Sequence, residues 1–101
     1  MKTKNKLTKN QSELLKLLGQ DYSPKRIDLE LCLYRKLNDD CDFEISGTSR
    51  KGREMTVYIW DIRAGEGHDA RIIETVRGIK DAGQLKQALD ELVYKYKYNV
   101  Q

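Results

Sequence analysis

The predicted fold depends on the stretch IDLELCLYRKL, residues 27–37. Apolar side chains occupy every second position of its first part, at Ile27, Leu29, Leu31 and Leu33. This period of two is typical of a strand that buries one face. The alternative is a helix with Ser23 as its N-cap and Pro24 at its first position. In a helix, four apolar side chains at every second position would spread over more than half of the circumference and would not form one buried face. We therefore expect an extended strand.

Three further strands are predicted downstream, at residues 43–46, 55–62 and 71–76. The stretch MTVYIWDI, residues 55–62, is rich in β-branched and aromatic side chains and is apolar on both faces, which favours a central strand. Short polar loops at residues 47–54 and 63–69 separate the strands. Such loops are too short for parallel crossovers, so the strands should form an antiparallel meander with residues 27–34 at an edge.

A helix is predicted at each end of the chain. Thr8 and Gln11 have the spacing of a capping box before the run SELLKLL, residues 12–18, and Gly19 is suited to end that helix. Asp81 and Gln84 form a second capping pair. The helix that follows has a single apolar face, made of Leu85, Ala88, Leu89, Leu92, Val93 and Tyr96. This amphipathic helix should lie across one face of the sheet.

The sequence therefore predicts an α+β fold of the order α-β-β-β-β-α: a short N-terminal helix, a four-stranded antiparallel meander and a C-terminal amphipathic helix packed across one face. The 101 residues suit a single small domain. Residues 1–7 should form a flexible basic arm in front of it, and residues 20–26 a connector.

Composition excludes several classes of protein. The chain is 35% charged and 39% apolar, with two cysteines and a net charge of +3, which does not fit collagen, a coiled coil alone or a disulfide scaffold. No apolar run approaches the roughly 20 residues of a membrane span, and the basic N-terminus leads into no secretory signal, so we expect a cytoplasmic protein. Cys32 and Cys41, without a CxxC motif, are expected to be reduced thiols.

Residues 1–26 carry seven Lys or Arg against two acids, and residues 27–48 carry two against six. This uneven distribution fits a nucleic acid, an acidic protein or docking within the chain, although solubility alone also explains it.

Signals for catalysis are few. His68, the only histidine, lies between Glu66 and Asp69 and is either a general base or an exposed loop residue; the second interpretation is favoured. Asp39, Asp40 and Asp42 lack the spacing of a calcium loop and are expected to form a solvated acidic turn. No nucleophile motif or complete dinucleotide fingerprint is present. We therefore expect no enzymatic activity, no metal and no cofactor.

The expected function is a small non-catalytic binding module that acts on another protein, as a regulator, adaptor or stoichiometric inhibitor. Tyrosines adjoining charged residues on the outer side of the C-terminal helix suit a protein-binding surface, made of Tyr94, Lys95, Lys97 and Tyr98. The alternative is that the two tyrosines pack on the N-terminal helix. The strand at residues 27–34 also offers an edge for a homodimer.

A nucleic-acid-binding protein is the alternative function. Its phosphate contacts would come from the N-terminal arm and the loop at residues 49–53, through Lys2, Lys4, Lys6, Lys9, Arg50, Lys51 and Arg53. Tyr58 and Trp60 share one face of a central strand and would stack on bases if uncovered. We expect them instead in the core beneath the C-terminal helix.

Overall fold

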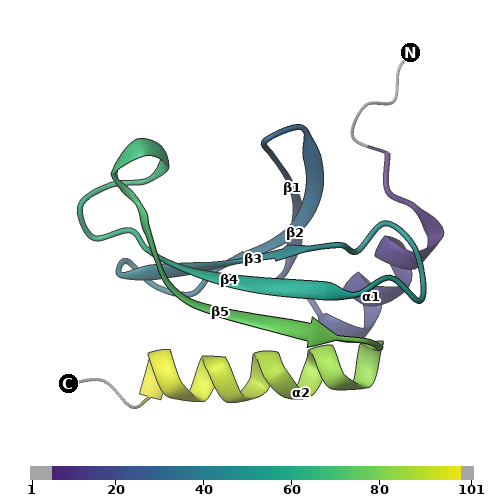
Figure 1. The fold of residues 1–101 in the computed structure, drawn as a ribbon. Helices are drawn as coiled ribbons and strands as arrows, with labels where there is room; N and C mark the ends of the chain where they lie inside the picture. The colour runs from purple at the N-terminus through teal and green to yellow at the C-terminus, as the bar shows by residue number, and fades with distance from the viewer. Residues whose placement is uncertain (1–5, 99–101) are drawn as a thin grey trace.

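Five antiparallel strands form one sheet in the order β1-β2-β3-β4-β5, and helix α2 lies against one face (Figure 1). The computed structural model describes residues 6–98, with side chains for residues 6–97. Its elements are α1 (Lys9–Leu18), β1 (Ser23–Ile27), β2 (Glu30–Lys36), β3 (Cys41–Ser46), β4 (Met55–Asp61), η1 (Gly67–Asp69), β5 (Arg71–Ile79), α2 (Ala82–Val93) and η2 (Tyr94–Tyr98). The α+β class is confirmed, but the sheet has five strands and the expected four is wrong.

The extra strand arises because residues 27–37 do not run straight. The chain turns at Asp28 and Leu29, which have φ angles of 51° and 73°. Ile27 of β1 pairs with Glu30 of β2. Asp28 and Leu29 therefore form a two-residue hairpin turn, of the type in which asparagine and glycine are the most frequent residues. The alternation of apolar residues continues from Ile27 through the turn residue Leu29 into β2. Because the pattern is not interrupted at the turn, it predicted one strand where the structure has two.

The expected edge at residues 27–34 is also wrong. Strand β2 lies between β1 and β3, and its residues Leu33 and Tyr34 are paired on both sides, Leu33 with Pro24 and with Ile45. The edges of the sheet are β1 and β5. Residues 30–34 therefore belong to an interior strand, and only Ile27 of the segment 27–34 lies in an edge strand.

Helix α1 is capped as the sequence indicates. The Thr8 hydroxyl accepts a hydrogen bond from the Gln11 backbone N–H (3.1 Å), and the Gln11 side chain accepts one from the Thr8 N–H (3.0 Å). The Gln11 amide also donates to the Leu31 carbonyl (2.9 Å) and the Thr48 hydroxyl (3.1 Å). One buried side chain thus starts the helix and attaches it to β2 and to the loop after β3.

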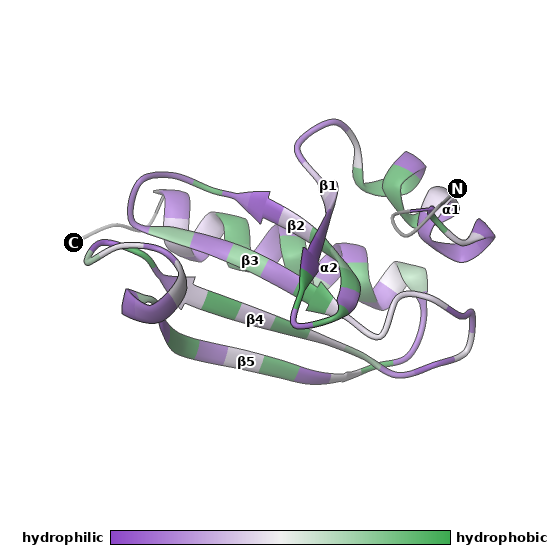
Figure 2. Ribbon diagram, turned by 90° about the horizontal axis from the view of Figure 1, so that it is seen from above, coloured by the Kyte–Doolittle hydropathy of each residue, from purple (hydrophilic) through white to green (hydrophobic). Residues whose placement is uncertain are grey.

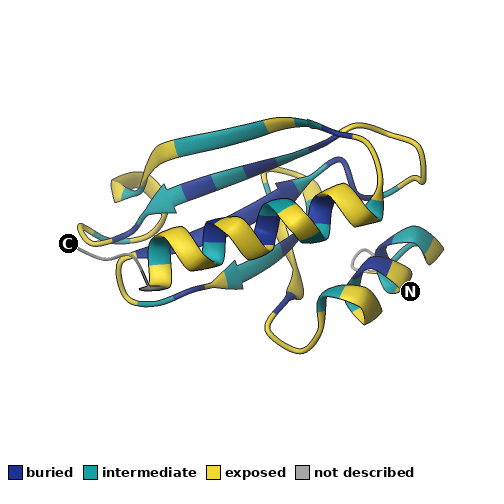
Figure 3. Ribbon diagram, turned by 90° about the horizontal axis from the view of Figure 1, so that it is seen from below, coloured by how far each residue is buried: buried dark blue, intermediate teal, exposed yellow. Residues whose placement is uncertain are grey.

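Helix α2 provides most of the cover for the core. Asp81 caps it by accepting a hydrogen bond from the Gln84 N–H at 2.8 Å. The expected apolar face is confirmed: Leu85, Leu89 and Leu92 are buried against the sheet, whose contribution to the same core includes Leu33, Phe43, Ile45, Val57 and Ile59. Figure 3 shows the buried positions of α2 along the side that meets the strands.

The opposite face of the sheet has a different cover. There the β1–β2 hairpin and the segment between β4 and β5 rise from the sheet (Figure 1), and the hairpin crosses over its neighbours when seen from above (Figure 2). Within residues 6–98, no α-helix covers this face, and the short 3-10 helix η1 belongs to the segment that rises from it. None of the helices in that range combines the length and apolarity that a membrane crossing requires.

Candidate functional site

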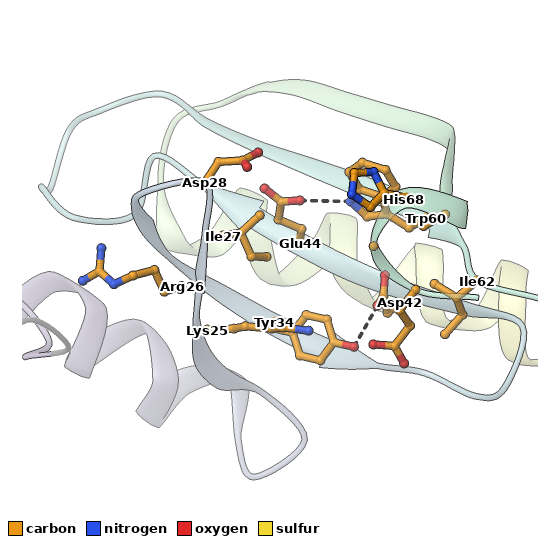
Figure 4. A pocket seen from close by; sticks show the side chains of 13 residues that line it. Lys25, Arg26, Ile27, Asp28, Tyr34, Asp42, Glu44, Trp60, Ile62 and His68 are labelled. Carbon is orange, nitrogen blue, oxygen red and sulfur yellow. Dashed lines mark hydrogen bonds between the residues drawn. The ribbon is translucent and has the colours of Figure 1, made fainter.

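A cavity of about 430 Å³ lies on the face of the sheet opposite α2 (Figure 4). Its floor is formed by side chains of β2, β3 and β4. One wall is the end of β1 with the following turn, and the other is the segment between β4 and β5. We call this cavity the sheet pocket; its lining is Lys25, Arg26, Ile27, Asp28, Tyr34, Asp42, Glu44, Trp60, Ile62, Glu66, Gly67, His68 and Ala70.

Strand register explains why the floor is polar and aromatic. Tyr34 lies opposite Glu44, and Asp42 lies opposite Trp60, so these four side chains share one face of the sheet. Successive side chains of a strand point to opposite faces. The side chains that alternate with these four along β3 and β4 therefore point toward α2. Phe43, between Asp42 and Glu44, is one of them and is among the most buried side chains.

Two hydrogen-bonded pairs hold the floor. The Tyr34 hydroxyl donates to Oδ2 of Asp42 at 2.7 Å, and the Trp60 indole N–H donates to Oε1 of Glu44 at 2.9 Å. The Cys32 thiol lies 3.8 Å from the other oxygen of Glu44. Asp42 and Glu44 retain only 6% and 9% of their accessible surface. Both carboxylates are thus fixed in position and largely removed from water.

Burial makes these carboxylates weaker acids. It raises the pKa of Asp42, and the nearby Glu66 raises it further, while the hydrogen bond from Tyr34 and the charge of Lys25 oppose the change. Burial also raises the pKa of Glu44, with Asp28 and Glu30 adding to it and the donors Trp60 and Cys32 opposing it. Clusters of perturbed acids in a cavity are typical of functional sites.

Lys25 contributes a cation directly above the floor. Its ammonium group lies 4.1 Å from the centroid of the Tyr34 ring, within the range of a cation–π interaction. Lys36 pairs with Glu66 at 3.7 Å on the rim. The pocket lining as a whole holds four carboxylates against one lysine and one arginine, a formal charge of −2 with His68 neutral.

The buried Asp42 should make stability depend on pH. Its pKa is higher in the folded protein than its usual value of 3.8, so the ionised carboxylate destabilises the fold at neutral pH, and this effect is relieved as the pH falls through the raised pKa. We expect Asp42→Asn to increase the free energy of unfolding at about pH 7, and the gain to disappear near pH 3, where Asp42 is protonated in both states. The Tyr34 hydroxyl still has an acceptor in the amide.

Urea unfolding at the two pH values measures this effect. Asp39→Asn, at an exposed position of the same acidic segment, is the matched control and should leave stability unchanged at both. An Asp42→Asn protein less stable than the wild type at neutral pH would contradict the expectation.

Cys32 and Cys41 are both free and buried. Burial, helped by neighbouring acids, raises the pKa of the Cys32 thiol to about 12 and that of Cys41 to about 11. Both are therefore protonated thiols at neutral pH, and a protonated thiol is a poor nucleophile.

The expected protein-binding surface lies partly within the described residues. Tyr94 is 66% exposed, as its position on the outer side of the C-terminal helix indicates. Lys95 donates to Glu74 of β5 at 2.9 Å and is thus tied to the sheet. Lys97 is exposed, and the side chain of Tyr98 lies outside the described residues.

Three basic residues of the alternative function line a second, smaller hollow, and these are Arg50, Lys51 and Arg53. Lys2 and Lys4 lie outside the described residues, and Lys6 and Lys9 are exposed. Side chains of the β3–β4 loop and of the start of α2 line a hollow of about 260 Å³, and its basic members are Arg50, Lys51, Arg53 and Lys80. Glu13 and Asp81 line the same hollow, so its charge is mixed.

The structure corrects two expectations, the placement of Tyr58 and Trp60 in the core and the placement of Asp42 in a solvated turn. Trp60 and Tyr58 do not lie beneath the C-terminal helix; they are on the opposite face, and Trp60 lines the pocket. Asp42 is not part of a solvated turn, because it belongs to β3 and is buried. His68 is exposed in a pocket wall, and its neighbour Glu66 pairs with Lys36.

Sequence reasoning missed Tyr34, Asp42 and Glu44 as site residues. The available signal was the alternation of Asp42, Phe43, Glu44 and Ile45, which places two acids together on the face opposite the core. No family model, curated protein or solved structure matches the chain, so function is argued from the geometry alone.

Proposed function

We propose that this protein is a non-catalytic binding module that engages a partner protein through the pocket face, by which we mean the sheet pocket together with the Asp28–Leu29 turn above it. The observation that carries the proposal is the sheet pocket, with side chains that are already fixed by hydrogen bonds. Ligand sites are usually preformed cavities with a few well-placed polar groups. The floor residues come from three adjacent strands, which hold them more rigidly than loops would.

The turn beside the pocket gives a second argument. Leu29 is 93% exposed and has a left-handed backbone, which costs a non-glycine residue about 1–2 kcal/mol. The Arg26 guanidinium donates to the Leu29 carbonyl at 3.0 Å and supports the turn. Strained residues that persist in a structure are concentrated at binding sites and active sites. We infer that Leu29 is retained as an apolar contact for the partner.

The chemistry of the pocket supports binding over catalysis. Each floor carboxylate accepts a hydrogen bond from an aromatic donor of the protein itself, Tyr34 or Trp60. The thiols of Cys32 and Cys41 are buried and protonated, as described above. Two free cysteines also suit a reducing compartment, so we place the protein in the cytoplasm.

Quantitative affinity capture from extracts of the source cells tests this proposal. Tagged wild-type protein is compared with Leu29→Gly and with Asp42→Asn, two changes that the backbone and the Tyr34 hydrogen bond tolerate. Tyr94→Ala, on the expected helix surface, is the matched control. We expect a captured protein that is depleted by both pocket-face variants and retained by Tyr94→Ala.

Loss of the same protein with Tyr94→Ala alone would assign binding to the helix surface and overturn the proposal. Capture that is equal for all four proteins, or capture of nothing by the wild type, would also overturn it. Circular dichroism of each variant establishes that the fold is retained before the comparison is made.

Nucleic-acid binding is the second candidate, favoured by the basic side chains around the smaller hollow. Fluorescence anisotropy with a labelled oligonucleotide at low and moderate salt tests it. Binding that weakens steeply with salt, and that Arg50→Gln with Arg53→Gln reduces, would support it. Absence of binding at low salt would remove it.

A further inference from the structure

We propose that the group which enters the sheet pocket is the cationic end of an arginine or lysine side chain of the partner. This inference rests on the proposed function, because it names the chemistry that the pocket face recognises. It adds that Lys25 occupies part of the same site in the free protein.

The charge of the cavity is the first argument. Asp28, Asp42, Glu44 and Glu66 line one space of about 430 Å³. Their charges act on one another, since Glu66 raises the pKa of Asp42 and Asp28 raises the pKa of Glu44. In Figure 4 the carboxylate of Asp28 points toward that of Glu44. A cation placed between such groups relieves their repulsion and gains charge-assisted hydrogen bonds.

The aromatic floor is the second argument, and it selects the kind of cation. The rings of Tyr34 and Trp60 belong to the lining, and faces of aromatic rings attract ammonium and guanidinium groups. Both groups stand on apolar stems, which suit Ile27 and Ile62 in the walls. Among residues 6–97, no three His, Cys, Asp or Glu side chains are arranged to hold a metal ion.

Lys25 is the third argument, because it shows how a cation sits on this floor. Its ammonium group lies 4.1 Å from the Tyr34 ring centroid, and its charge lowers the pKa of the neighbouring Asp42. The side chain of Lys25 belongs to an exposed residue of edge strand β1, so it is free to move aside. A cation from the partner would take its place over Tyr34 or sit beside it against Glu44 and Trp60.

NMR titration tests the inference with a small probe, Nα-acetyl-arginine amide. The chain has one tryptophan, so a single indole N–H resonance reports on the pocket floor. We expect this resonance to shift with a dissociation constant in the range of about 1–10 mM, as suits one side chain. Nα-acetyl-citrulline amide has nearly the same shape without the charge and should bind about tenfold more weakly, the effect of losing a charge-assisted hydrogen bond.

Two variants test the sign of the electrostatics. Asp42→Asn should weaken arginine binding by about fivefold to tenfold. Lys25→Met removes the internal cation while retaining an apolar side chain of similar length, and should strengthen binding by about threefold. Opposite changes from two neighbouring residues cannot come from a general loss of folding.

The inference is overturned if citrulline amide binds as well as arginine amide, if Lys25→Met weakens binding, or if Nα-acetyl-glutamate amide is the probe that shifts the resonance. It is also overturned if arginine and lysine amides leave the resonance unchanged up to about 100 mM, far above the expected dissociation constant. In that case the capture experiment still decides the proposed function, because a partner that needs Leu29 and Asp42 establishes binding at the pocket face without a cationic group.

Discussion

Replacement of Phe43 by alanine is expected to lower the free energy of unfolding by about 3–5 kcal/mol. Phe43 is fully buried at the centre of β3 and packs in the core that α2 covers. Removal of its ring loses buried apolar surface and leaves a cavity that neighbouring strands cannot close. Since small domains have only about 5–15 kcal/mol of stability, the change should shift the urea midpoint strongly.

Tyr94→Ala is the matched control for this experiment, because it also removes an aromatic ring. Tyr94 is 66% exposed, so we expect a change of about 0.5 kcal/mol or less. Equal losses for the two variants in urea unfolding would contradict the placement of Phe43 in the core.

Gly47→Ala should have the second large effect, about 3 kcal/mol of destabilisation. Gly47 follows β3 with a φ of 79°, where an L side chain is strained, and an added Cβ would collide with the carbonyl oxygen of Glu54 and lie 3.3 Å from the Met55 Cα. The obstacle is backbone, so it cannot rotate away. The Gly47 N–H also donates to Glu30 at 2.9 Å, which couples this position to β2.

Gly52→Ala separates the collision from the backbone strain. Gly52 lies in the same loop with a φ of 87°, but an added Cβ would have no atom within 4 Å. We expect it to destabilise the protein by about 1 kcal/mol, from the backbone conformation alone. Thermal unfolding of both variants measures the difference, and a Gly52→Ala protein as unstable as Gly47→Ala would contradict the close approach of the two strand ends.

Local signals allowed both helices to be predicted. Thr8 with Gln11, and Asp81 with Gln84, fix the helix starts through hydrogen bonds between residues three apart, so they are visible in the sequence. The apolar face of α2 follows from helical periodicity. Both kinds of signal depend only on neighbours along the chain, and the structure agrees with them.

The β1–β2 hairpin was not predictable because Leu29, the second residue of its turn, is not a residue that usually marks one. Leu29 continues the apolar alternation although it is the most exposed of the large apolar residues of the described chain. Pro24 falls in the expected connector at residues 20–26, but it lies in β1, an edge strand, and edge strands are where a sheet tolerates proline. The apolar alternation here includes an exposed residue, which the core does not explain.

The candidate site was predictable only in part. The alternation in β3 places Asp42 and Glu44 on the face opposite Phe43, and this was visible in the sequence. Their burial was not visible, because it depends on the hairpin and the β4–β5 segment folding over the sheet. The pairs Tyr34–Asp42 and Glu44–Trp60 depend on strand register, which the predicted positions of the loops alone do not fix.

The position of α2 after all five strands has a consequence for synthesis of the protein on the ribosome. Neighbouring strands follow one another along the chain, so the meander is able to assemble hairpin by hairpin as it emerges. Its apolar side remains bare until Leu85, Leu89 and Leu92 have left the exit tunnel. Between the emergence of β5 and that of α2, this apolar side is open to contact with other proteins, and exposed apolar surface makes a folding chain prone to aggregate.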